Sequence, residues 1–172
     1  ANICLLVNFF LSIFLFINYI NYKIVNNFKP KTSNQNTFYN IIGEEDTQLV
    51  LCHGIAGTGK TYVSIYKALQ DVLRRGTPYN KLIIINPTVD VGNEDKLGFL
   101  PGELSSKIQQ YNESTFTILD KIIGKARATK MISDGKLEIG VLNFLRGVNL
   151  ENCYVILDEA QNVSPMQIKT LM

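Results

Sequence analysis

The chain has 172 residues, with 17 Lys and Arg against 15 Asp and Glu, so its length suits about one domain of ordinary size. The net charge of +2 is too small to indicate a polyanionic partner, and three scattered Cys are too few for a disulfide scaffold or a Cys-based metal site. The composition therefore excludes a disordered chain, a small disulfide-rich secreted protein and a membrane protein with several spans.

The first 22 residues carry no charged side chain and form an apolar leader. Ile3–Ile20 contains 15 apolar residues, and a helix of that length would measure about 27 Å, close to the hydrocarbon core of a bilayer. Lys23 and two further Lys would keep the rest of the chain in the cytoplasm. Three interpretations stay open: an artefact or unrelated leader, a membrane anchor, or part of the core. The expected localisation is cytoplasmic, with anchoring by residues 3–20 as the alternative.

Residues 23–47 are expected to form a linker and a short helix, and residues 48–172 the main domain. Phe28–Asn36 is polar, and Thr32 or Ser33 is placed to cap a helix over Thr37–Ile42. The chain starts at Ala1 and stops at Met172 inside an expected helix, so we expect a fragment.

A phosphate-binding loop follows the apolar run Gln48–Cys52, which is expected to be a buried strand. The loop matches the pattern G-x-x-x-x-G-K-[ST] in full. Its glycines let backbone N–H groups turn inward around a phosphate, and the next helix directs its positive N-terminus at the same anion. Lys60 is expected to reach the β- and γ-phosphates, and Thr61 to ligate Mg²⁺. The expected nucleotide-binding residues are Gly54, Ile55, Ala56, Gly57, Thr58, Gly59, Lys60 and Thr61.

The context of the loop argues against a chance match. Apolar residues recur at helical spacing from Tyr62 to Leu73, Arg74 and Arg75 suit the last turn of that helix, and Gly76 suits its end.

A second part of the site is expected at the end of the β-prone run Tyr154–Leu157, where Asp158 and Glu159 follow. In P-loop enzymes an Asp at this place supports Mg²⁺, and the adjacent Glu is placed to polarise a water against the γ-phosphate. Paired acids also open helices, where they complement the dipole. The phosphate loop earlier in the chain favours catalytic Glu159 and metal-binding Asp158.

Two more strands are expected, over Lys81–Asn86 and Leu137–Val141. Strands that alternate with helices predict a parallel α/β sheet, with ligands at the carboxyl ends of its strands. The residues assigned to phosphate, Mg²⁺ and water all follow such strands.

With these motifs, two further stretches make the chain resemble the PhoH-like family of P-loop ATPases. One is Asn86–Val89 followed by Lys96–Leu104, and the other is Asn143–Gly147 followed by Asp158–Asn162. The resemblance covers about Lys29 to Met172. It implies a P-loop NTPase fold of the RecA/helicase type, incomplete at the C-terminus, with ATP and Mg²⁺ as ligands. It further implies ATP hydrolysis, action on RNA and a homo-oligomeric ring.

By the same similarity, Gln35 lies where helicase-like cores place a Gln that reads adenine, nineteen positions before Gly54. A carboxamide can pair with both N6 and N7 of adenine. The alternative is a surface Gln in a capped helix.

The chain also departs from the family pattern. Asn86 stands where many members have Arg, which weakens the case for an anion contact there. Gly92–Leu104 is interpreted as a substrate or subunit-contact loop, against a simple connector. Arg146 suits either a phosphate or subunit contact, or a helix surface. Four basic residues lie on or near one helical stretch after the Gly92–Leu104 loop, and a solvated helix face is favoured over RNA contact for them. They are Lys121, Lys125, Arg127 and Lys130.

Three functions are compatible with this combination of motifs, and the third is disfavoured. The first is an ATPase coupled to RNA remodelling, and the second is a nucleotide-dependent regulatory or assembly module with slow turnover. A phosphotransferase is disfavoured, because Glu159 suits a water nucleophile and no substrate lid is evident.

The last expectation concerns a strand beyond Met172. In helicase-type folds, the strand after the Asp-Glu pair inserts between the loop strand and the acidic strand. Without it, two strands lack their shared neighbour, at a cost of roughly 1–3 kcal/mol for each buried unpaired group. We therefore expect these 172 residues alone not to form a stable, active ATPase.

Overall fold

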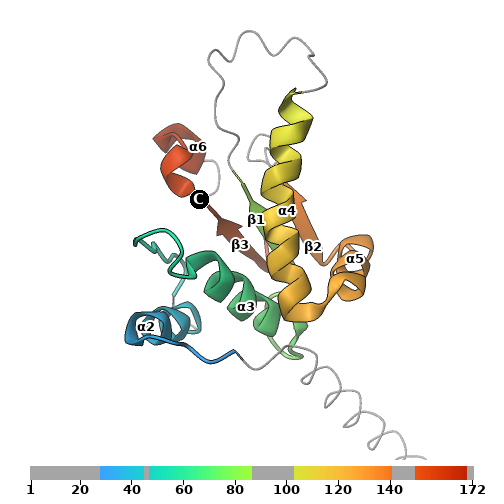
Figure 1. Cartoon of the computed structure of the whole chain (residues 1–172). Helices are drawn as coiled ribbons and strands as arrows, with labels where there is room; N and C mark the ends of the chain where they lie inside the picture. The colour runs from blue at the N-terminus through green and yellow to red at the C-terminus, as the bar shows by residue number, and fades with distance from the viewer. Residues whose placement is uncertain (1–27, 45–46, 87–102, 141–149, 170–172) are drawn as a thin grey trace, which may run out of the picture.

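The computed structural model describes residues 28–44, 47–86, 103–140 and 150–169 (Figure 1). These residues form a three-stranded parallel sheet with helices packed against it. The strands are β1 (Lys81–Ile85), β2 (Leu137–Gly140) and β3 (Cys153–Leu157). The helices are α2 (Ser33–Ile42), α3 (Lys60–Leu73), α4 (Glu103–Ile123), α5 (Lys125–Ser133), the 3₁₀ turn η3 (Ala160–Asn162) and α6 (Pro165–Lys169).

The sheet has the order β2-β1-β3, and both pairings are parallel. Ile85 lies opposite Gly140 on one side and Leu157 on the other, so the three strands end at the same edge. The predicted parallel α/β sheet of P-loop type is therefore confirmed.

The core lies between the sheet and the three helices α3, α4 and α5, and Figure 1 shows α4 lying across the sheet between α3 and α5. Alternate residues of β1 face this core, with Leu82 and Ile84 on the helix side. Ile83 and Ile85 lie on the opposite face with Leu157 and Val163. The four apolar side chains of β1 are fully buried, because a central parallel strand has neighbours on both edges and both faces.

Helix α2 packs against α3 and begins under the predicted cap. The Thr32 hydroxyl accepts a hydrogen bond from the backbone N–H of Gln35, and the helix starts four residues earlier than expected, at Ser33 rather than Thr37. Phe28 anchors the segment before α2, because its ring lies 5.1 Å from the ring of Tyr66 on α3 and its N–H donates to the Tyr66 hydroxyl.

The prediction of a strand over Gln48–Cys52 is wrong, because residues 48–52 form no strand. Leu49 is 60% exposed and Leu51 is 87% exposed. Among the described residues β3 pairs only with β1, so no strand lies beside this segment to pair with its backbone. An apolar run becomes a strand only where a neighbour accepts and donates its hydrogen bonds.

Several sequence-based expectations lie outside the described residues. They are the leader Ile3–Ile20, the part of the Gly92–Leu104 loop before Glu103, and Arg146. Among the helices that are described, none combines the length and the apolar character needed to cross a bilayer.

Candidate functional site

The phosphate loop leads into α3 through two glycines in the left-handed region. Gly57 has φ 77° and Gly59 has φ 84°, conformations in which a side chain would be strained. Gly59 caps α3 without any side-chain hydrogen bond, so the first N–H groups of the helix receive no partner from the cap residue. This arrangement suits an anion, since free N–H groups and the helix dipole point the same way.

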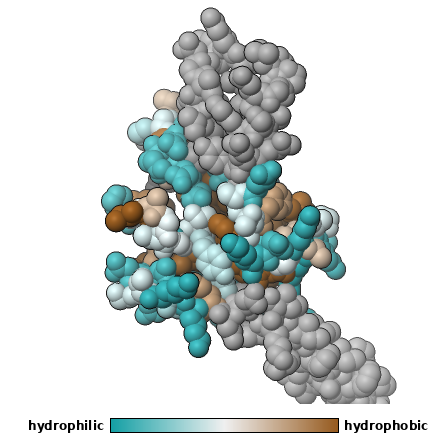
Figure 2. Space-filling model, viewed as in Figure 1, coloured by the Kyte–Doolittle hydropathy of each residue, from teal (hydrophilic) through white to brown (hydrophobic). Residues whose placement is uncertain are grey.

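Lys60 begins α3 and folds back over the loop. Its Nζ donates to the carbonyl oxygens of Gly54, at 2.8 Å, and of Ile55, at 3.0 Å. The Thr58 hydroxyl donates to the same Ile55 carbonyl at 2.9 Å. These bonds hold the loop around the ammonium group, and the loop itself is exposed to solvent. In Figure 2 the described surface is mostly hydrophilic, with hydrophobic side chains at the left margin, where Figure 1 places this loop.

The structure brings Thr61 and Asp158 together from positions 97 residues apart. The Thr61 hydroxyl donates to the Asp158 carboxylate, with 2.9 Å to Oδ1 and 3.1 Å to Oδ2. Asp158 is fixed at the end of β3, because its N–H donates to the carbonyl oxygen of Ile85 in the neighbouring strand.

A hydroxyl and a carboxylate are oxygen ligands of the kind that Mg²⁺ prefers. Two protein ligands suffice for a nucleotide site, where Mg²⁺ takes its remaining ligands from water and phosphate. The pair Thr61 and Asp158 therefore fits the metal that the sequence assigns to it. Within the described ranges, no three His, Cys, Asp or Glu side chains gather into a larger metal cluster.

Glu159 follows Asp158 in a backbone conformation that is rare for a residue with a side chain. Its φ of 50° and ψ of 38° lie in the left-handed region, and it caps the short turn η3. Its carboxylate accepts a hydrogen bond from the Gln161 side-chain amide. Sequence reasoning used Gln161 only as part of a family motif and missed this contact, although the two-residue spacing of the side chains was visible.

The structure places Gln35 against the phosphate loop. Its side-chain Nε2 donates to the Thr58 carbonyl at 2.9 Å, and its Oε1 accepts from the Lys31 N–H at 2.7 Å. The carboxamide thus joins the segment before α2 to the loop. It retains a second N–H and one further lone pair on Oε1, so these bonds leave room for a base contact. Adenine recognition by Gln35 stays a prediction.

Asn86 has a role that the sequence did not indicate. Its side chain is 5% exposed and donates to the Thr115 hydroxyl on α4 at 3.4 Å, and Thr115 is 2% exposed. The end of β1, next to the end of β3, is therefore connected to α4 by a buried polar pair.

The two described cysteines, Cys52 and Cys153, both have thiols with a raised pKa. Burial raises the pKa of the Cys153 thiol, with Lys81 acting in the opposite direction. A raised pKa keeps the thiol protonated and unreactive.

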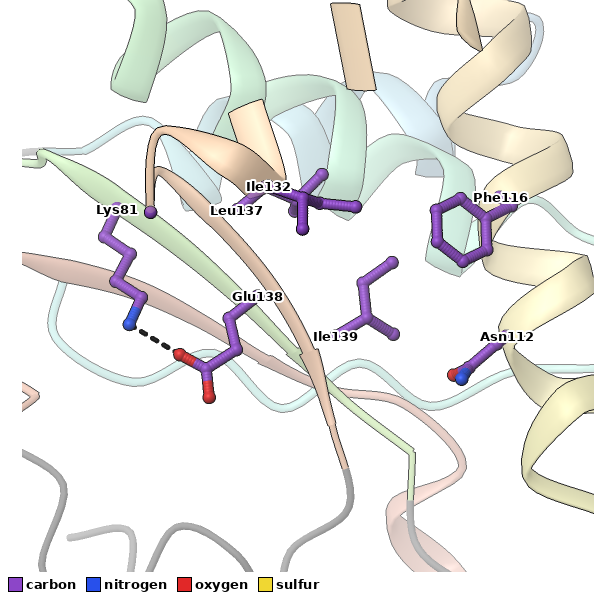
Figure 3. Close-up of a pocket in the computed structure, with 8 residues that line it drawn as sticks. Lys81, Asn112, Phe116, Ile132, Leu137, Glu138 and Ile139 are labelled. Carbon is purple, nitrogen blue, oxygen red and sulfur yellow. Dashed lines mark ion pairs between the residues drawn. The ribbon is translucent and has the colours of Figure 1, made fainter. Parts of the chain in front are cut away.

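A separate pocket of about 330 Å³ lies between α4 and α5, at the edge of β2 that pairs with no other described strand (Figure 3). Phe116, Ile132 and Ile139 form its apolar wall, while Lys81 and Glu138 form an ion pair at its margin. It shares no residue with the phosphate loop, Asp158 or Glu159. The pocket therefore lies apart from the residues that the sequence assigns to the nucleotide.

The chain is similar to one protein family and to several individual proteins. The family described as PhoH-like protein matches residues 27–172. A PhoH-like protein of Bacillus subtilis (strain 168) is 37% identical over 144 residues, which cover 84% of this chain and 43% of that protein. A PhoH-like protein of Synechocystis is 35% identical over the same length, covering 84% and 42%. The protein PhoH of Escherichia coli (strain K12) is 33% identical over 130 residues, covering 74% and 36%.

The chain thus spans about two fifths of the length of the first two relatives. The matched region contains the phosphate loop, Asp158 and Glu159, and it does not include the apolar leader. Since the family match extends over residues 27–172, the chain belongs to the PhoH-like protein family.

Proposed function

We propose that this chain binds ATP with Mg²⁺ and contributes the hydrolytic site of a PhoH-like ATPase. The observation that carries the proposal is the hydrogen bond between Thr61 and Asp158, which joins the phosphate loop to the acidic end of β3. Membership in a family of nucleotide-binding domains supports it.

In the proposed complex, the N–H groups of residues 54–59 and the N-terminus of α3 bind the phosphates. The Lys60 ammonium leaves the carbonyl oxygens of Gly54 and Ile55 for the β- and γ-phosphate oxygens, a short movement for a flexible side chain. Thr61 and Asp158 would hold Mg²⁺, which would supply positive charge to neutralise the phosphate oxygens.

Glu159 is the proposed general base. One of its carboxylate oxygens takes a proton from a water whose oxygen bonds to the γ-phosphorus. The bond from that phosphorus to the β–γ bridging oxygen breaks, and ADP leaves with the electron pair. The products are ADP and phosphate, and the proton on Glu159 returns to solvent.

Gln35 is proposed to select adenine. Its contact with the Thr58 carbonyl supports a place beside the bound nucleotide, and a bidentate contact to the base is worth about 1–3 kcal/mol of discrimination. Comparable affinity of the protein for ATP and GTP would remove this role.

Coupling to RNA is proposed from the resemblance to helicase-type cores, and a slow regulatory or assembly module is the alternative. Faster phosphate release in the presence of RNA would support coupling. A slow rate that RNA leaves unchanged, with subunits assembling on ATP, would favour the module instead.

The test of the site uses full-length protein containing this chain and isothermal titration with ATP–Mg²⁺. Lys60→Ala should abolish or greatly weaken binding, because it removes the cation assigned to the phosphates. Lys136→Ala is the matched control, since Lys136 is an exposed lysine before β2. Glu159→Gln should keep binding and lose hydrolysis, because it removes the basic oxygen and preserves shape. Unchanged affinity in Lys60→Ala would contradict the proposal.

A further inference from the structure

The contact between Gln161 and Glu159 has no part in the chemistry described so far. The Gln161 Nε2 donates to Oε2 of Glu159, and both side chains are exposed at the carboxyl end of β3. An exposed Glu without such a contact would sample several rotamers, and only some of them direct an oxygen at a given water.

The backbone beneath this contact is fixed to the sheet. The N–H of Asn162 donates to the Glu159 carbonyl at 2.9 Å, and the N–H of Val163 donates to the Ala160 carbonyl at 3.1 Å. Val163 then packs on the face of the sheet that holds Ile83 and Ile85. These contacts connect the turn η3 to the same sheet that holds Asp158, whose N–H is bonded to β1.

The left-handed conformation of Glu159 fits the same arrangement. At φ 50° and ψ 38° the chain turns sharply after Asp158, and this turn brings the side chain of Gln161 back to that of Glu159. A rare conformation at a charged residue in a site indicates a constraint that the surrounding structure maintains.

A carboxylate offers two oxygens, and Gln161 engages one of them. Among the described residues, Oε1 of Glu159 accepts no hydrogen bond that would compete with a water. We infer that Gln161 is a positioning residue: it holds Oε2 and thereby leaves Oε1 oriented to receive the proton of the attacking water. This inference rests on the proposed role of Glu159 as the base.

The first test separates binding from turnover in the full-length protein. Gln161→Ala should lower kcat by about 10- to 100-fold, the range expected when a reacting group is misplaced by up to 1 Å, while the affinity for ATP–Mg²⁺ stays within about twofold. Asn162→Ala is the control, because Asn162 lies in the same turn and contributes its backbone N–H to Glu159. Equal kcat in Gln161→Ala and wild type would overturn the inference.

The second test asks whether Gln161 acts through Glu159. In the Glu159→Gln background, adding Gln161→Ala should cause no further loss of rate, because the group that it positions is already gone. A loss that multiplies with the first would overturn the inference, since Gln161 would then act independently.

A third measurement needs no activity. The side-chain amide resonances of Gln161 should shift in Glu159→Ala, while those of the exposed Gln48 stay unchanged. If the wild-type protein hydrolyses ATP and Glu159→Ala causes no shift, the inference alone is overturned. If Glu159→Ala causes the shift but the wild-type protein binds ATP and never hydrolyses it, both the inference and the proposed base are overturned.

Discussion

Two apolar, β-prone segments of this chain differ in secondary structure and in burial. Lys81–Ile85 is the central strand β1, and Leu82 within it is 0% exposed. Residues 48–52 lead into the phosphate loop as an irregular segment, and Leu51 is 87% exposed. The two segments have similar local composition, so composition alone did not decide between them.

The difference lies in their neighbours. β1 has a parallel strand on each edge and packs against helices on one face and a second apolar cluster on the other. No described strand lies beside residues 48–52. The phosphate loop is held instead by Lys60 at its end and by Gln35 from α2. The phosphate loop is therefore held in place by side-chain contacts, whereas Asp158 is held in place by the sheet.

The strongest test of the difference between the two segments is to make the same substitution, Leu to Ala, in each of them. Leu82→Ala should lower the free energy of unfolding by about 2–5 kcal/mol, because it removes a fully buried side chain and leaves a cavity. Leu51→Ala should change it by no more than about 0.5 kcal/mol, because the side chain is already in solvent. Urea denaturation of each variant measures both.

Equal losses in the two variants would mean that residues 48–52 are packed in solution, contrary to the structure. A cooperative transition in the wild-type chain of 172 residues, together with ATP turnover, would also contradict the expectation that this length alone is not a stable, active ATPase.

A smaller effect is expected from the buried pair at the end of β1. Asn86→Ala should cost about 1–3 kcal/mol, because it leaves the buried Thr115 hydroxyl without its partner. Asn80→Ala is the control, since Asn80 is exposed just before β1. Thermal unfolding of both variants gives the comparison, and equal melting temperatures would show that the Asn86 side chain adds no stability.

The smallest effect concerns pH. Burial raises the pKa of the Tyr154 phenol well above its ordinary range, with Asp71 and Tyr79 adding to the shift. The unfolded chain then loses the phenol proton first, near pH 10, so stability should fall by about 1 kcal/mol per pH unit between pH 10 and 11. Well below pH 10, where the phenol is protonated in both states, this group causes no pH dependence.

Tyr154→Phe has no phenol to ionise and should show a shallower decline in urea unfolding over the same range. It also loses the hydrogen bond from the phenol to the Ile42 carbonyl, so its stability at neutral pH should be slightly lower. An unchanged slope would assign the decline to other groups.

The sequence predicted the parts of the fold that depend on local pattern. The apolar runs before Asn86, Val141 and Asp158 became β1, β2 and β3 within a residue, because branched apolar side chains suit buried parallel strands. The loop motif and the helical spacing after Lys60 located α3, and the Thr32 cap located α2. Residues 48–52 are the exception, because their sequence pattern is that of a strand but no described strand lies beside them.

For the proposed site, the sequence by itself determined the candidate residues: a glycine loop with Lys60 and Thr61, an acidic pair, and Gln35 upstream. Only the tertiary structure decided that Thr61 bonds Asp158, that Gln35 reaches the Thr58 carbonyl and that Asn86 turns inward to Thr115. Motifs and periodicity are local properties of a chain, whereas these contacts join positions 97, 23 and 29 residues apart. Such contacts follow from the order in which strands pair and helices pack, which no local pattern encodes.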